Sequence, residues 1–223
     1  MTTRLGFEAI LKFSAGFALV AVLLFLPAGT VDYPGGWLLI SILFIPMFLA
    51  GLVMMAVNPG LLRSRLNAKE KEREQDQVVK LSGLMFLCGF ILAGLDFRFG
   101  WSHLPFAVNC VGAVLFLTAY VLYAEVLREN TWLSRTIEVQ EGQSVVSTGL
   151  YGIVRHPMYA VTILLFLMIP LVLGSWYALI AFAFYPAIIV VRLKDEEDLL
   201  TRELPGYAAY KQKVRYRIIP FIW

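Results

Sequence analysis

Arg155, His156 and Pro157 stand at the head of an apolar run, and their types suit the binding of an anion. A proline fits the first turn of a helix because its missing N–H would lack a partner there, so Pro157 predicts a helix start. The proline ring pushes the preceding residue out of the helical region, which predicts a capping position for His156. The backbone N–H groups and positive dipole of such a helix start favour a carboxylate or a phosphate. Arg155 adds a planar cation, although an arginine beside a membrane can also simply contact anionic headgroups.

A pair of carboxylates, Glu196 and Glu197, follows the last apolar run. On a helix that continues this run, Arg192 and Glu196 lie four residues apart and share a face with Leu199 and Leu200. Glu197 points about 100° away from that face. An acidic pair beneath an anionic leaflet needs a partner. Either neighbouring basic residues pair with it in water, or it binds a cation or the hydroxyl groups of a sugar.

Pro205 and Gly206 predict the end of this acidic helix. Tyr207 and Tyr210 then lie on one face of a short following turn. The basic residues beyond this turn are expected to rest on lipid headgroups.

Apolar helices must position these residues. Of the 223 residues, 59% are hydrophobic, which is more than a soluble fold of this size can hide. A helix needs roughly 20 residues to cross the hydrocarbon core of a membrane. Six uncharged apolar runs approach that length, at 13–29, 36–57, 81–95, 104–124, 157–173 and 176–191. We therefore predict an all-α polytopic membrane helix bundle of about six spans.

The last two runs are short and are joined by only Gly174 and Ser175, so we expect a tight helical hairpin. That hairpin brings together the polar segments 128–160 and 192–220, which flank it. Each of the two arms either spans a thin region of the bilayer or stops short of the far headgroups.

The basic residues indicate the orientation of the chain. If the N-terminus faces the cytoplasm, only Arg98 of the 19 Lys and Arg residues falls on the opposite side. Loops rich in Lys and Arg stay cytoplasmic, so we predict that both termini are cytoplasmic. The net charge of +3 therefore arises from basic loops on one side of the membrane, and we predict no nucleic-acid partner. For the alternating charges within 63–80 we expect a solvated helix that continues the second span.

Several classes of function find no support in the residues. Cys88 and Cys110 lie inside apolar runs, so neither a disulfide framework nor a CxxC-type metal site is predicted. None of the six runs contains an ionisable residue, which weighs against a proton-coupled carrier or an ion channel. A glycine-rich strand-to-helix turn of the Rossmann type is also missing.

The polar segments resemble those of the isoprenylcysteine carboxyl methyltransferase family, whose wider group includes membrane phospholipid methyltransferases. The motifs, within about 145–223, are Gly149-x-Tyr151-x-x-Val154-Arg155-His156-Pro157-Met158-Tyr159, Leu173-Gly174-Ser175-Trp176, Glu196-Glu197-x-x-Leu200, Pro205-Gly206-Tyr207-x-x-Tyr210 and Pro220. The family often has glycine two residues after the motif tyrosine, where this chain has Val161. The C-terminal motifs take the form seen in bacterial-looking members, so we expect a bacterial inner membrane and assume no prenylated protein substrate.

The resemblance implies S-adenosylmethionine as methyl donor, without a metal. It also implies a lipophilic acceptor, an isoprenylcysteine-type carboxylate or a lipid, which enters from the bilayer. Residues 1–144 are then N-terminal transmembrane helices, and 145–223 are a methyltransferase core that binds the donor at the cytoplasmic face. The implied donor-binding residues are Tyr151, Val154, His156, Pro157, Tyr159, Glu196, Glu197, Leu200, Tyr207 and Tyr210. Catalytic roles are expected for Arg155, Arg192 and Glu196.

Methyl transfer from a sulfonium is an in-line displacement that depends chiefly on alignment and desolvation. A carboxylate acceptor needs no base, and Arg155 and Arg192 orient it. An amine or thiol acceptor needs a base, for which His156 and Glu196 are candidates. Two other classes stay open: a membrane reductase with a nicotinamide cofactor, like the distantly similar sterol reductases, and a non-catalytic lipid-binding membrane protein.

Overall fold

The structure is a computed structural model, and it describes residues 2–66, 73–133 and 138–223. Its long helices are α1 (Thr2–Ala28), α2 (Pro34–Val57), α4 (Arg73–Phe99), α5 (Phe106–Glu129), α6 (Pro157–Leu173) and α8 (Tyr185–Glu203). Its short helices are α3 (Pro59–Leu66), α7 (Trp176–Phe182), α9 (Tyr207–Lys213) and the 3₁₀ turn η1 (Gly149–Gly152). The described residues contain helices and no strand, which confirms the predicted all-α class.

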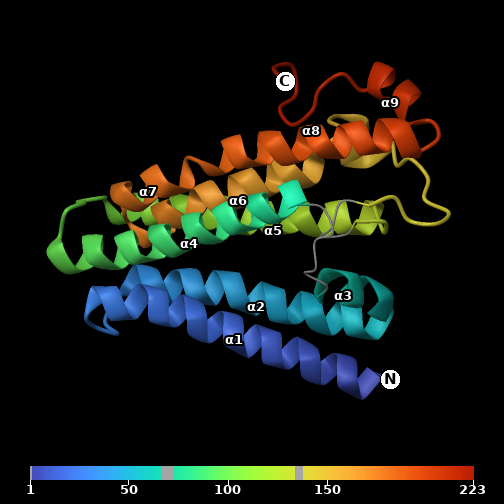
Figure 1. Cartoon of the computed structure of the whole chain (residues 1–223). Coiled ribbons are helices and arrows are strands. Elements are labelled where there is room, and N and C mark those ends of the chain that lie inside the picture. The colour runs from blue at the N-terminus through green and yellow to red at the C-terminus, as the bar shows by residue number, and fades with distance from the viewer. Residues whose placement is uncertain (1, 67–72, 134–137) are drawn as a thin grey trace.

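The helices form two layers (Figure 1). Helices α1 and α2 lie side by side in one layer, helices α4 to α8 form the other, and α1 packs against α4 between them. Helix α3 and the start of α6 lie at the same end of the bundle as α9, whereas α7 lies at the opposite end. We name these the α9 end and the α7 end.

Five stretches of helix are long and apolar enough to cross a membrane, namely Arg4–Ala28, Pro34–Val57, Gln77–Phe99, Phe106–Glu129 and Trp176–Glu203. Helix α6 is apolar but has only 17 residues. The predicted polytopic helix bundle is thus confirmed. That α6 forms a further crossing stays a prediction.

The second arm of the hairpin was predicted as a single helix over 176–191. The structure divides it into two helices, α7 and α8. Helix α7 ends at Phe182 and α8 begins at Tyr185, with Pro186 in the first turn of α8. The proline lacks an N–H and disfavours helical geometry before it, so the first helix ends here. Helix α8 then continues through the charged residues to Glu203, as predicted for the residues that follow this apolar run.

The chain after the second span also differs from the prediction. Helix α2 ends at Val57, and Asn58 leaves the helical conformation with φ −146° and ψ 78°. Because Pro59 follows and restricts the residue before it, α3 is a separate helix rather than a continuation. Much of the alternating charge predicted there, at 67–72, lies outside the described residues.

Helices α5 and α6 pack closely against each other. At Gly112 on α5, a Cβ atom would lie 2.9 Å from the Cβ of Leu171 on α6. Small residues at such crossings let helix backbones approach each other in a membrane. A continuous apolar core that includes Phe116 and Leu193 then joins α5 and α6 to α8.

A buried carboxylate, that of Asp96, lies at the α7 end. It accepts hydrogen bonds from Ser102 N (2.7 Å), from Ser102 Oγ (2.6 Å) and from the hydroxyl of Ser175. Ser175 also caps α7, because its Oγ accepts from Ala178 N at 3.0 Å. We call Asp96, Ser102 and Ser175 the Asp96 cluster. Asp96 lies just beyond the uncharged apolar run 81–95, because helix α4 continues past this run to Phe99. Neutral donors satisfy the carboxylate.

Candidate active site

The segment after α9 holds the head of α6 in place. Arg155 N donates to Tyr216 O and His156 N donates to Arg217 O, both at 2.8 Å. Pro157 begins α6 and His156 is its N-cap residue with φ −125°, so the predicted helix start is confirmed. Because the His156 N–H bonds to the protein, it does not serve an anionic ligand.

Glu197 is the centre of a buried ion-pair network. Its Oε1 atom accepts from Arg155 Nε at 2.6 Å and lies 3.2 Å from His156 Nε2. Its Oε2 atom accepts from Arg217 Nε at 2.9 Å. Glu197 is 2% exposed and Arg155 is 8% exposed, so each charge depends on the other for its partner. We call Glu197, Arg155, His156 and Arg217 the Glu197 network.

Arg155 makes further contacts with the same segment. Its Nη1 atom donates to Val214 O at 2.8 Å and to Arg215 O at 2.7 Å. Arg155 therefore joins three parts of the chain: the head of α6, the C-terminal part of α8 and residues 214–217.

Glu196 serves a different cluster from its neighbour Glu197. The Tyr159 hydroxyl donates to the Glu196 carboxylate. Arg192 Nε donates to the same hydroxyl at 3.2 Å. The ring of His156 stacks on that of Tyr159, with 5.6 Å between the centroids and 21° between the planes. The two adjacent glutamates thus point in different directions on α8, as predicted.

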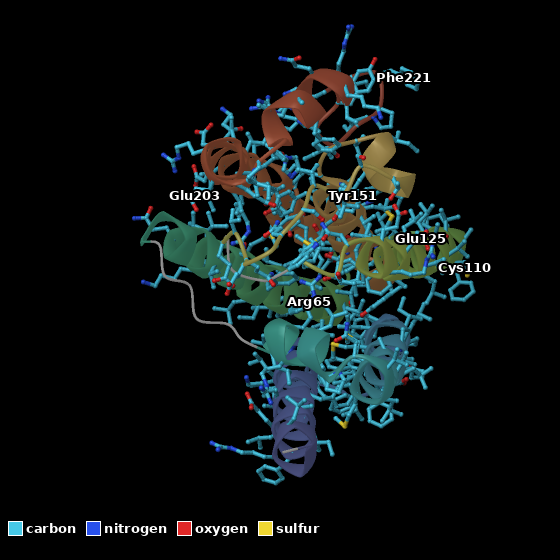
Figure 2. The ribbon with its side chains drawn as sticks, turned by 90° about the vertical axis from the view of Figure 1, so that its right-hand side faces the viewer. Arg65, Cys110, Glu125, Tyr151, Glu203 and Phe221 are labelled. Atoms are coloured by element: carbon cyan, nitrogen blue, oxygen red, sulfur yellow. The ribbon has the colours of Figure 1, made fainter. Side chains whose placement is uncertain are left out.

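A hollow lies between the head of α6 and the C-terminal part of α8. The empty space in it is about 820 Å³, a volume that includes the open solvent at its mouth. It is lined by Asn130, Trp132, Leu133, Glu138, Gln143, Ser144, Val145, Val146, Tyr151, Arg155, His156, Met158, Tyr159, Arg192, Glu196, Leu199, Leu200, Leu204, Tyr207 and Tyr210. Both predicted segments therefore contribute to one cavity, and Figure 2 looks onto the α9 end that contains it.

The structure brings most of the predicted site residues to this hollow. Those that line it are Tyr151, Arg155, His156, Tyr159, Arg192, Glu196, Leu200, Tyr207 and Tyr210. Val154, Pro157 and Glu197 are buried and are not among the lining residues. Pro157 starts α6, and Glu197 lies in its own ion-pair network.

Three tyrosine side chains supply buried hydroxyl groups. The Tyr151 hydroxyl accepts from Asn130 Nδ2 at 3.1 Å, and the Tyr210 hydroxyl donates to Tyr151 O at 2.7 Å. The Tyr207 hydroxyl is buried and finds no hydrogen-bond partner among the described residues. Burial raises the pKa of all three phenols above its ordinary value, so they are neutral near pH 7.

The motif glycine Gly149 has a steric role. It opens the turn η1 with a φ of +48°, and the Glu129 carboxylate occupies the space where a Cβ atom would lie. Only glycine fits both conditions without strain. The turn then places Tyr151, two residues later, on the wall of the hollow.

The sequence prediction placed the connection between α5 and η1 within the polar segment 128–160 but named none of its residues as a site residue. This connection contributes Asn130, Trp132, Leu133, Glu138, Gln143, Ser144, Val145 and Val146 to the lining. The segment has no helical or strand periodicity, so it resembles an ordinary solvated loop. The apolar pair Trp132 and Leu133 inside this polar loop is the signal that could have identified it.

The fold and the hollow define a class: an integral membrane protein whose apolar bundle carries a polar pocket at one end. Residues 108–202 match the model of the isoprenylcysteine carboxyl methyltransferase (ICMT) family. The match covers somewhat less than half of the chain and begins earlier than the motifs alone indicated. It confirms the predicted resemblance and indicates a membrane methyltransferase.

The chain is also similar to a curated protein, the Delta(14)-sterol reductase TM7SF2 of Mus musculus. The two are 31% identical over 91 residues, which are 40% of this chain and 22% of the reductase. The chain thus spans only a minor part of that relative.

Proposed function

We propose that the protein is an S-adenosylmethionine-dependent membrane methyltransferase that acts on a lipophilic acceptor at the cytoplasmic face. The observation that supports this most is the hollow that joins the head of α6 to the C-terminal part of α8. The donor bears an ammonium, a sulfonium and two ribose hydroxyls. The Glu196 carboxylate suits the positive groups, and the unpartnered Tyr207 hydroxyl suits a polar atom of a bound molecule.

The lining residues have distinct roles in this proposal. When bound, S-adenosylmethionine supplies an electrophilic methyl group. Tyr151, Tyr159, Glu196, Tyr207 and Tyr210 contact it. His156 and Leu200 complete its wall, whereas the buried Val154, Pro157 and Glu197 shape the site from behind. Their contribution is alignment of the donor and exclusion of water, which can supply most of the rate gain in a displacement.

The acceptor is oriented by Arg192 rather than by Arg155. Arg192 lines the hollow and contacts Tyr159, whereas Arg155 donates to Glu197 and to two carbonyl groups. We therefore assign Arg155 a positioning role and Arg192 a contact with the acceptor in the hollow. For an amine or thiol acceptor, Glu196 is the better base, because His156 Nε2 faces Glu197.

A transfer assay tests the proposal directly. Purified protein is incubated with donor that carries a radiolabelled methyl group and with a membrane lipid extract, and the labelled species is identified. We expect label in the lipid fraction with wild type and a strong loss with Glu196→Gln. Absence of both transfer and S-adenosylhomocysteine binding contradicts the proposal.

A second candidate is a membrane reductase with a nicotinamide cofactor, favoured by the similarity to the sterol reductase. Thermal shift separates the two functions. Stabilisation by S-adenosylhomocysteine supports the methyltransferase, and stabilisation by NADPH alone supports the reductase. A non-catalytic lipid-binding protein requires instead that Arg155→Ala and Glu196→Ala leave ligand binding unchanged.

We further propose a bacterial inner membrane location with both termini cytoplasmic, N-terminal spans over 1–144 and a methyltransferase core over 145–223. Cysteine labelling tests the orientation. In a background without Cys88 and Cys110, Pro205→Cys introduces a thiol at an exposed position beside the hollow. A membrane-impermeant maleimide added to intact cells is expected to leave this thiol unlabelled until the cells are lysed. Labelling before lysis contradicts the orientation.

A further inference from the structure

Arg65 is a cation beside the hollow that lies outside the family match and its motifs. It belongs to α3, and its Nη2 atom lies 3.9 Å from the Sδ atom of Met158. Its guanidinium carbon lies 5.7 Å from the centre of the Tyr123 ring on α5. Because Met158 lines the hollow, Arg65 lies directly behind one of its walls. In Figure 2, Arg65 lies on the side of α3 that faces the layer of Tyr151.

Arg65 is a partly buried cation. Its Nε atom is buried and has no hydrogen-bond partner among the described residues. In the part of the chain that the structure describes, no carboxylate pairs with this guanidinium. Arg155 and Arg217, at the same end of the bundle, both pair with Glu197. A partly buried cation without a partner is costly, so the position of Arg65 favours an anion beyond those that the described residues supply.

The surroundings of Arg65 combine this charge with apolar surface. Met158 and Tyr123 provide apolar contacts beside the guanidinium. The positive charge also acts on the hollow, because it opposes the effect of burial on the pKa of Tyr151. An anion attached to a hydrocarbon chain therefore suits this corner better than a free ion does.

We propose that Arg65 binds the anionic group, a carboxylate or a phosphate, of the lipophilic methyl acceptor. The acceptor then lies on the Met158 side of the hollow, and the donor lies on the side of Glu196 and Tyr207. This inference rests on the proposed methyltransferase function and adds to it a residue, Arg65 on α3, that recognises the anionic group of the acceptor.

A binding experiment on the full chain in lipid nanodiscs tests the inference. The probes share one hydrocarbon group: N-acetyl-S-farnesylcysteine carries a carboxylate, farnesyl phosphate carries a phosphate, and farnesol is neutral. The variants are Arg65→Gln, Arg65→Lys and, as a matched control, Arg63→Gln. Arg63 lies on the same helix but is exposed.

Arg65→Gln is expected to weaken the binding of at least one anionic probe by about tenfold or more, the loss typical of a charged hydrogen bond. Farnesol binding is expected to stay unchanged in this variant, and Arg63→Gln is expected to behave as wild type. Arg65→Lys keeps the charge but not the planar donor geometry, so it is expected to retain part of the anion preference. Loss for the carboxylate probe alone or for the phosphate probe alone identifies the group that is recognised.

Two results overturn the inference. One is equal weakening of the anionic and neutral probes by Arg65→Gln, which indicates a structural role. The other is unchanged binding of all three probes. Binding of S-adenosylhomocysteine to the same samples reports on the methyltransferase function separately. Its absence from wild type refutes that function, whereas its presence without an Arg65 effect refutes only the role of Arg65.

Discussion

Two carboxylates are buried at opposite ends of the bundle, and their partners differ in kind. Asp96 at the α7 end accepts from two serine side chains and a backbone N–H. Glu197 at the α9 end accepts from two guanidinium groups and faces an imidazole. The Asp96 carboxylate accepts only from uncharged donors of its own cluster. The Glu197 network, in contrast, includes Arg155 and His156, which line the hollow. We infer that the Asp96 cluster serves structure alone and that the Glu197 network links structure to ligand binding.

Glu197→Gln is expected to have the largest effect. It removes the charge that two buried guanidinium groups share, and breaking such a pair costs about 3–5 kcal/mol. We expect unfolding at much lower temperature and loss of S-adenosylhomocysteine binding, measured by thermal denaturation and by equilibrium dialysis. A variant of wild-type stability that still binds the donor analogue breaks the proposed link between stability and binding.

Glu196→Gln is the matched change on the adjacent residue. It removes a carboxylate from the hollow and leaves the Glu197 network intact. We expect the affinity for S-adenosylhomocysteine to fall by roughly 10- to 100-fold, while stability changes by only about 1 kcal/mol. Similar losses of stability in both glutamate variants are the result that contradicts separate roles for the two residues.

Asp96→Asn tests the opposite end of the bundle. The amide keeps the shape of the side chain, but one of its two terminal groups cannot accept from the serines. We expect a loss of stability of about 1–3 kcal/mol with unchanged affinity for S-adenosylhomocysteine, measured by the same two assays. A weakened affinity in a folded Asp96→Asn protein shows that the two ends are coupled.

Tyr207→Phe is expected to have the smallest effect. The hydroxyl has no partner in the described residues, so its removal costs the folded protein little and relieves a buried unsatisfied group. We expect equal or slightly higher stability and a decrease of about 5- to 10-fold in the affinity for S-adenosylhomocysteine. Unchanged affinity shows that the donor does not use this hydroxyl.

Local sequence rules predicted the elements that depend on local chemistry. Pro157 marked the start of α6, Pro205 and Gly206 marked the end of α8, and the spacing of Glu196 and Glu197 indicated their divergent directions. Each of these features follows from backbone restriction or helical periodicity within a few residues.

Features that depend on distant residues escaped the prediction. The contact of Arg155 with residues 214–217 joins positions about 60 residues apart, and no local pattern records it. The loop residues that line the hollow lie there because α5, which precedes the loop, packs on α6. The hollow itself was predicted from the hairpin, but the eight loop residues among its 20 lining residues were not. The sequence of a loop without periodicity does not indicate which residues lie near it.

The contacts of Arg155 have a consequence for the order of events during synthesis. Glu197 follows Arg155 by 42 residues, and the carbonyl of Arg215 follows it by 60. At about 5–20 residues per second, the ribosome delivers these partners roughly 2–8 s and 3–12 s after Arg155. Before these partners are synthesised, the Arg155 guanidinium has to remain hydrated. The head of α6 therefore cannot reach its folded position while α8 is still being translated. A ribosome stalled between positions 197 and 215 is therefore expected to leave Arg155 open to proteolysis and chemical labelling.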